Sequence, residues 1–202
     1  MKNLITAFVM FFAVPLFAQD TDCDDPNKIL CCRAANATIV AITPLSELKC
    51  KAEKAHLYNI FPKIPIYKEF LFNQINHCSS DSKSTALLEF QYCIAKTRLH
   101  MTVTISDFND PFYKTDVGAS QVNLYKTMFQ VGTSPILRTY PSNNKKFDQS
   151  FIAMPSEREH FVTYEGMYKN RYFVHIVVDG DRFKLASEVD AYLKDYIDGF
   201  NL

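Results

Sequence analysis

Residues 90–106 read FQYCIAKTRLHMTVTIS, and the alternation of side chains in this stretch decides the fold class. A period of two over this length predicts β-strands with one buried face. Lys96 and Thr97 fall between the two alternating runs, so we expect a turn there and an antiparallel hairpin around it. The apolar members of the pattern are Phe90, Tyr92, Ile94, Leu99, Met101, Val103 and Ile105.

Amphipathic helices are predicted before the hairpin, after it and at the end of the chain. Thr43-Pro44 is typical of a helix start, and Asp116 is a candidate cap for the second helix. The third helix is predicted to end at Gly199. Residues spaced by three and four form the predicted buried stripes: Leu45, Leu48, Ala52 and Ala55, then Val122, Tyr125, Met128 and Phe129, then Leu185, Val189, either Tyr192 or Leu193, Tyr196 and Ile197.

Further strands are predicted on both sides of the second helix. Residues 65–72 read as an extended segment, and 73–85 as an exposed loop rich in Ser and Asp. Strands are then expected at 136–140, 147–154, 161–164 and 171–178, the last apolar on both faces, as in a central strand. The predicted fold is therefore α+β, a mainly antiparallel sheet with helices packed on its faces.

The first 18 residues have the order of a secretory signal peptide. Lys2 precedes the uncharged apolar run 4–17, and Ala18 stands before a polar stretch. The run is shorter than the roughly 20 residues that a membrane span needs, so we expect no transmembrane anchor. The sequence predicts a secreted or periplasmic protein, with residues 19–202 as a single domain.

All six cysteines lie in the N-terminal half of the mature chain. Because exported proteins meet an oxidising compartment, an even count predicts disulfides that staple the N-terminal segment to the sheet. Six cysteines allow 15 pairings, and the sequence does not choose among them. Without a Cys-x-x-Cys motif, a metal or redox site is the less favoured interpretation. The cysteines are Cys23, Cys31, Cys32, Cys50, Cys78 and Cys93.

Two segments of the C-terminal part resemble the PsbP-like fold class. Residues 104–108 read TISDF before a helix, and residues 171–181 read RYFVHIVVDGD before the terminal helix. That class includes many small exported bacterial proteins of unknown role, which generally serve as binding or accessory modules. The resemblance implies a binding module and transfers no functional residue.

Composition and motifs narrow the function classes. Lys and Arg number 22 and Asp and Glu also 22, so no basic excess points to a nucleic acid or an anionic membrane surface. The chain lacks the motifs of serine hydrolases, zinc proteases, P-loops and dinucleotide binding. We therefore predict no cofactor and no metal, and favour a non-enzymatic protein.

Histidines supply the alternative, an envelope hydrolase that uses His and carboxylate chemistry. Glu157 and His160 stand three residues apart, which places two side chains on one helical face, although the neighbouring charges favour a solvated turn. His100 falls on the polar side of its strand, and His175 is the first choice for a buried titrating group. An enzyme requires at least two of these residues to converge within hydrogen-bond reach in one concave pocket.

Aromatic residues support the binding interpretation. The chain has 17 Phe and 11 Tyr but no Trp, and most of these rings belong to the core. Tyr113, Tyr140, Tyr164 and Tyr168 fall at predicted strand ends or loops, where a ring with a polar tip favours recognition. The leading hypothesis is an exported module that binds an envelope protein or a small apolar ligand against its sheet. An immunity or inhibitor protein is a special case.

Overall fold

The computed structural model describes residues 41–48, 51–76, 86–94, 99–131, 133, 136, 138–155 and 160–202. The predicted signal peptide and five of the six cysteines lie outside these residues. The described elements are the 3₁₀ turn η2 (Leu45–Glu47), α1 (Lys51–Ile60), β1 (Ile66–Tyr67), β2 (Phe70–Asn76), β3 (Leu87–Cys93), β4 (His100–Asp107), the 3₁₀ turn η3 (Pro111–Lys114), α2 (Asp116–Val131), β5 (Thr139–Pro141), β6 (Gln149–Ala153), β7 (Phe161–Tyr168), β8 (Tyr172–Asp179) and α3 (Ala186–Asp198). The predicted order of helices and strands is confirmed.

The strands form one antiparallel sheet of eight, in the order β1-β2-β3-β4-β8-β7-β6-β5. The predicted hairpin is β3–β4, with Phe90 opposite Val103 and Tyr92 opposite Met101, and its turn lies outside the described residues. β8 pairs with β4 on one side and β7 on the other, as its apolar sequence predicted. The α+β prediction is confirmed.

Several predicted boundaries are wrong, because sheet pairing extends strands into polar sequence. β2 runs to Asn76, within the stretch expected to be a loop, because Asn76 pairs with Glu89 of β3. β7 continues to Tyr168, four residues beyond its predicted end, along its pairing with β8. The first predicted helix is divided into η2 and α1.

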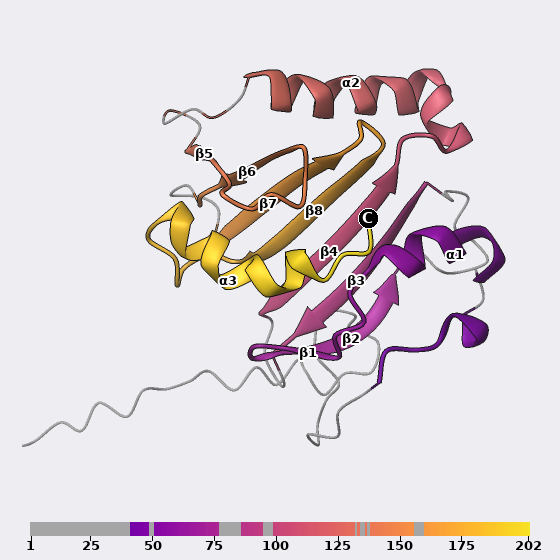
Figure 1. Ribbon diagram of the computed structural model, residues 1–202, viewed down its shortest axis with the longest axis horizontal. Helices are drawn as coiled ribbons and strands as arrows, with labels where there is room; N and C mark the ends of the chain where they lie inside the picture. Colours follow the sequence, from indigo (N-terminus) through magenta and orange to yellow (C-terminus); the bar gives the residue numbers. More distant parts are fainter. Residues whose placement is uncertain are drawn as a thin grey trace, which may run out of the picture.

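One face of the sheet, called the covered face, carries α1 and α3 (Figure 1). Phe61, which follows α1, stacks on Phe90 with ring centroids 3.9 Å apart, and the hydroxyls of Tyr92 and Tyr196 lie 3.0 Å apart. Full burial of such a side chain contributes about 1.5–3 kcal/mol. The strand residues of this face are Leu88, Phe90, Tyr92, Met101, Val103, Ile105, Ile152, Val162, Tyr164, Val174, Ile176 and Val178.

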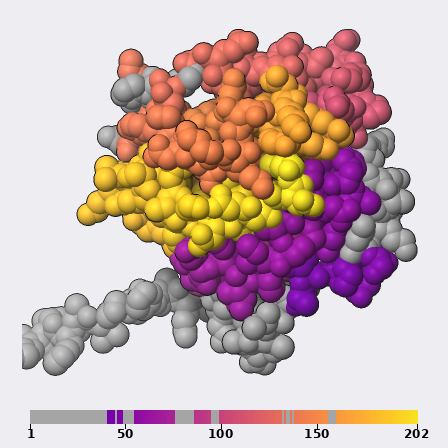
Figure 2. Space-filling view, viewed as in Figure 1, coloured from indigo at the N-terminus to yellow at the C-terminus, as the bar shows by residue number. Residues whose placement is uncertain are grey.

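α3 contributes four buried residues to the covered face, Val189, Leu193, Tyr196 and Ile197, as its spacing predicted. In Figure 2 the helix (yellow) lies between the N-terminal elements (purple) and the β5–β6 region (orange). Leu185, expected in the same stripe, is instead 60% exposed. The reason is that Leu185 is the N-cap residue and has an extended backbone, so it precedes the helical face.

The second face of the sheet packs against α2 at one end. Tyr125 of α2 stacks on Phe173 of β8 with centroids 4.2 Å apart, and Val122 and Phe129 join the same cluster. Met128, predicted in this stripe, is 37% exposed.

Thr115, and not the predicted Asp116, caps α2, because its hydroxyl accepts a hydrogen bond from the Gly118 N–H. Gly118 has no room for a side chain. A Cβ atom there would lie 2.1 Å from the Phe112 carbonyl oxygen, so glycine allows α2 to pack closely on η3.

Candidate functional site on the open face of the sheet

The strand register places polar side chains in rows on the second face, beyond the part that α2 packs against. The first row is Glu89, Thr104, His175 and Glu165, which lie opposite one another across β3, β4, β8 and β7. The second row is Gln91, Thr102, Val177 and Thr163, and His100 and Phe161 belong to the third. We call these ten residues the open face. Each is the alternate neighbour of a core residue, because successive strand side chains point to opposite faces.

A pocket of about 340 Å³ lies on the open face. Phe161, on its border, is 51% exposed although it is a large aromatic residue. At the other end, the ring of His175 lies 6.3 Å from that of Phe173, which belongs to the cluster under α2. The α2 cluster therefore bounds one end of the pocket. The described lining residues are Glu89, His100, Thr102, Thr104, Phe161, His175 and Val177.

His175 and Glu165 form a hydrogen-bonded pair at the base of the open face. His175 Nδ1 lies 2.6 Å from Glu165 Oε1, and Glu165 is only 4% exposed. Its second oxygen, Oε2, is buried and has no hydrogen-bond partner among the described residues. With Nδ1 engaged by Glu165, the imidazole has Nε2 left for a ligand or water.

The environment raises the pKa of both partners. Burial raises the pKa of Glu165, and the opposing effect of His175 does not cancel it. For His175, burial lowers the pKa. The hydrogen bond and the charge of Glu165 raise it by more than burial lowers it, so the pKa of His175 lies above its usual value. A single proton held between the two groups would leave the pair with no net charge, wherever that proton resides.

His100 is the second histidine of the pocket. Its Nδ1 atom is buried and has no hydrogen-bond partner among the described residues. Burial lowers the pKa of its imidazole, which is therefore neutral at neutral pH. A buried polar atom without a partner costs stability. A ligand group that bonded to this nitrogen would remove that cost.

The structure brings together only part of the predicted catalytic set. His175 and His100 line one pocket, but His100 is four residues from Thr104, which lies opposite His175, so about 13 Å of strand separates them. His160 is exposed and pairs with Asp181 at 3.0 Å, away from this pocket. Glu157 lies outside the described residues. The predicted convergence of these groups within hydrogen-bond reach is not present among the described residues.

Sequence reasoning missed Glu165, the closest partner of His175. The predicted strand ended at Tyr164. Glu165 was therefore not counted among the alternate residues that share a face of the sheet with Phe161 and Thr163. The signal was available, because Glu165 lies two residues after Thr163 on a strand that pairs with the His175 strand.

Two of the four predicted recognition tyrosines are buried, so that prediction is wrong for them. Tyr164 is fully buried on the covered face, within the extended β7 strand. Tyr113 is buried in η3, where its ring lies 5.1 Å from that of Phe108. Tyr140 is exposed and Tyr168 is half-buried, and both remain available to a partner.

Cys93 is the one cysteine among the described residues. It is fully buried and disulfide-bonded, and the pairing of the six cysteines stays a prediction because the other five lie outside the described part of the chain. Within that part, no group of three or more His, Cys, Asp or Glu could hold a metal ion. None of its helices is long and apolar enough to cross a membrane.

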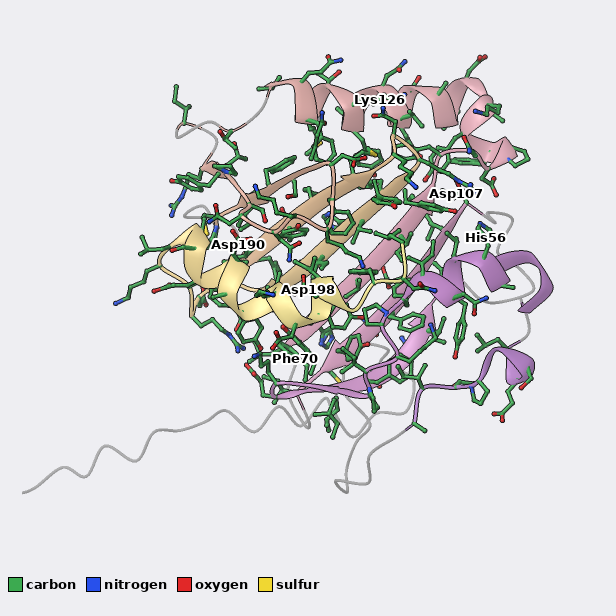
Figure 3. All side chains as sticks on the ribbon, viewed as in Figure 1. His56, Phe70, Asp107, Lys126, Asp190 and Asp198 are labelled. Atoms are coloured by element: carbon green, nitrogen blue, oxygen red, sulfur yellow. The ribbon has the colours of Figure 1, made fainter. Side chains whose placement is uncertain are left out.

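Asp107, at the end of β4, has a structural role. The Arg171 guanidinium donates two hydrogen bonds to its carboxylate, at 2.8 and 2.7 Å, and His56 Nε2 of α1 lies 3.3 Å away (Figure 3). Burial alone would raise the pKa of Asp107, but these partners lower it below its usual value. The cluster fastens β4 to the start of β8 and to α1.

A larger groove of about 670 Å³ borders α3, near Asp190 and Asp198 (Figure 3). The Asp190 carboxylate accepts hydrogen bonds from the Ser142 hydroxyl and the Asn143 N–H, both at 2.6 Å. Lys194 pairs with Asp198. These groups hold the loop after β5 against α3, so the open face is the stronger candidate site.

Comparisons of the chain with protein-family models, curated proteins and solved structures find no match. The resemblance to the PsbP-like class stays a prediction.

Proposed function

We propose that this protein is an exported, non-enzymatic binding module that holds a small ligand in the open-face pocket. The observation that carries the proposal is the concentration of polar side chains and one exposed aromatic ring on a sheet face next to a well-packed helix. Binding sites are typically concave, with apolar surface and a few polar groups that fix orientation. Phe161 and Val177 supply the apolar surface here, and Glu89, His100 and His175 the polar groups.

Folding does not account for the polar character of this face. The buried Glu165 carboxyl and the His100 nitrogen, which has no hydrogen-bond partner among the described residues, both cost stability, whereas an apolar residue in place of Glu165 would extend the α2 cluster. Groups that oppose stability are expected where function requires them. The volume of about 340 Å³ lies at the lower end of the usual range for small-molecule sites, about 300–1,000 Å³.

Export to the periplasm or the medium, with disulfides among the six cysteines, is part of the proposal. The apolar run behind Lys2 supports a signal peptide, and the buried, bonded Cys93 supports one bridge. The PsbP-like resemblance also favours a binding or accessory role.

A hydrolase is the second candidate, favoured by the His175–Glu165 pair. A carboxylate that orients an imidazole is the arrangement of a general base, and it leaves Nε2 to accept a proton. A base needs a nucleophile, and Thr104, next to His175 on β4, is the hydroxyl nearest in register, but it donates to Glu89 at 3.3 Å. Binding is therefore the better-supported function.

Filling the pocket tests the proposal. Thr102→Phe places a ring in its middle row, while Leu124→Phe adds the same ring at an exposed site on α2. Both variants and the parent protein are screened by thermal shift against neutral, anionic, cationic and apolar small molecules. The proposal predicts that at least one class stabilises the parent and the α2 variant but not Thr102→Phe.

The screen also distinguishes the alternatives. Ligands that stabilise all three proteins equally bind elsewhere and contradict the proposal, as does a screen without any hit. The hydrolase predicts turnover of ester or amide substrates that is lost in His175→Gln, and such turnover would replace the binding function.

A further inference from the structure

We infer that the ligand of the open-face pocket is a neutral sugar, with its hydroxyl groups on the second row of the open face and one face of its ring against Phe161. This inference rests on the proposed function and adds the chemical class of the ligand. It follows from the uncharged polar groups of that row, from the exposed aromatic ring beside it and from the contacts of the charged groups.

The second row of the open face presents hydrogen-bonding groups without charge. Gln74 of β2 extends this row, because Gln74 lies opposite Gln91. Neighbouring strands lie about 4.8 Å apart, so the extended row spans about 19 Å across five strands. A ligand that lies along the row meets amide groups, hydroxyl groups and one apolar side chain. In order across the sheet the residues are Gln74, Gln91, Thr102, Val177 and Thr163.

The polar groups of this row match the hydroxyl groups of a sugar. A threonine hydroxyl both donates and accepts, and a side-chain amide has both a donor group and an acceptor. Gln91 Oε1 accepts from the Gln74 amide at 2.9 Å and from the Asn73 amide at 3.4 Å, which leaves the NH₂ group of Gln91 to donate. His175 adds its Nε2 atom from the neighbouring row. A sugar hydroxyl can donate to or accept from each of these groups.

Phe161 supplies an apolar surface for the ring of the sugar. Its side chain lines the pocket and is 51% exposed. Phe161 lies opposite Asp179, two residues beyond Val177 on β8, so Phe161 and Val177 are diagonal neighbours. Asp179 itself pairs with Arg182 at 3.8 Å. The C–H groups on one face of a sugar ring can pack on Phe161 and Val177, while the hydroxyls around its edge bind the polar groups of the row.

The charged groups of the pocket are engaged with one another. Glu89 accepts a hydrogen bond from Thr104 at 3.3 Å, and its negative charge acts on His175. His175 is in turn bonded to Glu165. No lysine or arginine is among the described residues that line the pocket. An anion therefore finds no basic partner there, and a cation has to compete with contacts that already exist, whereas a neutral ligand does neither.

Sugars that differ in charge but share a ring framework test the inference. The full mature protein is first applied to an array of neutral, anionic and cationic glycans. Isothermal titration calorimetry at neutral pH then compares diacetylchitobiose with its deacetylated, cationic form, and cellobiose with its anionic uronic acid form. We expect neutral glycans to bind, and the charged form of a bound glycan to bind about tenfold more weakly, because its charge loses hydration without gaining a partner.

Three variants locate the sugar on the sheet. Phe161→Ala removes the exposed ring and is expected to weaken binding of a neutral glycan about tenfold. Thr102→Val keeps the shape of threonine without its hydroxyl and is expected to weaken binding about twofold to tenfold. The matched control is Tyr140→Ala, which removes an exposed ring opposite Ile152, on the covered side of the sheet, and is expected to leave the affinity unchanged.

The outcomes distinguish this inference from the proposed function. An array without a neutral glycan, a charged form that binds as tightly as its neutral partner, or unchanged affinity in both Phe161→Ala and Thr102→Val overturns the sugar class. If another class of compound stabilises the parent protein but not Thr102→Phe, the binding function stands without the sugar. If neither the array nor the thermal-shift screen gives a ligand, both proposals fail.

Discussion

The covered face and the open face come from alternate residues of the same strands, yet they have opposite chemistry. On the covered face, residues such as Tyr92 and Ile176 are fully buried beneath α1 and α3. One residue earlier on each strand, Gln91 and His175 belong to the open face, where the buried atoms His100 Nδ1 and Glu165 Oε2 have no hydrogen-bond partner among the described residues. Stability is therefore concentrated on one face, and the other is free to carry polar groups that do not favour folding.

The largest expected effect comes from removing a ring on the covered face. Tyr196 is fully buried between α3 and the sheet, so Tyr196→Ala should destabilise the protein by about 3–5 kcal/mol, through lost burial and the cavity left behind. Tyr196→Phe removes only the hydroxyl 3.0 Å from that of Tyr92 and should cost about 1 kcal/mol. Urea unfolding measures both, and equal costs would contradict a packing role for the ring.

An intermediate effect is expected at Asp107, where charged groups hold the end of β4 against the start of β8 and α1. Asp107→Asn should cost about 2 kcal/mol, because hydrogen bonds to a charged partner are lost and Arg171 is still partly solvated. The lowered pKa of Asp107 means that its contribution is present above the usual pKa of aspartate, about 4, and is lost as the pH falls through the folded value. Parent and variant should therefore converge in stability below about pH 4, and a gap that widens on acidification would contradict this assignment.

The smallest effect is expected on the open face. Thr102→Val, at a half-exposed position in the pocket, should change the free energy of unfolding by less than about 0.5 kcal/mol. The variant keeps the shape of threonine and removes the hydroxyl. A loss of more than about 1 kcal/mol in urea unfolding would mean that the open face is structural after all.

The sequence predicts the residues of the covered face better than those of the open face. Alternation identified the β3–β4 hairpin and the buried partners Phe90 and Val103, because a period of two depends only on local backbone geometry. The same pattern placed His100 and Thr104 on a polar side. It missed Glu165, because the end of β7 depends on pairing with β8, although Glu165 continues the alternation two residues after Thr163.

Pairing between distant strands explains the other errors. Tyr164 was predicted at a strand end and therefore at a recognition surface, but the longer β7 places it in the middle of the covered face. His160 and His175 were both candidates for one catalytic site, but His160 pairs with Asp181 and His175 pairs with Glu165. Burial and partners depend on neighbouring strands that the local sequence does not specify.

The sequence by itself determined the element types, the antiparallel hairpin and the apolar faces of α2 and α3, because each depends on residue spacing along a single element. Only the tertiary structure decided that β4 pairs with β8, which brings Glu89 of β3, His175 of β8 and Glu165 of β7 into one row. The physical reason is that a strand specifies which of its residues share a face but not which strand lies beside it. The proposed ligand site depends on that second choice.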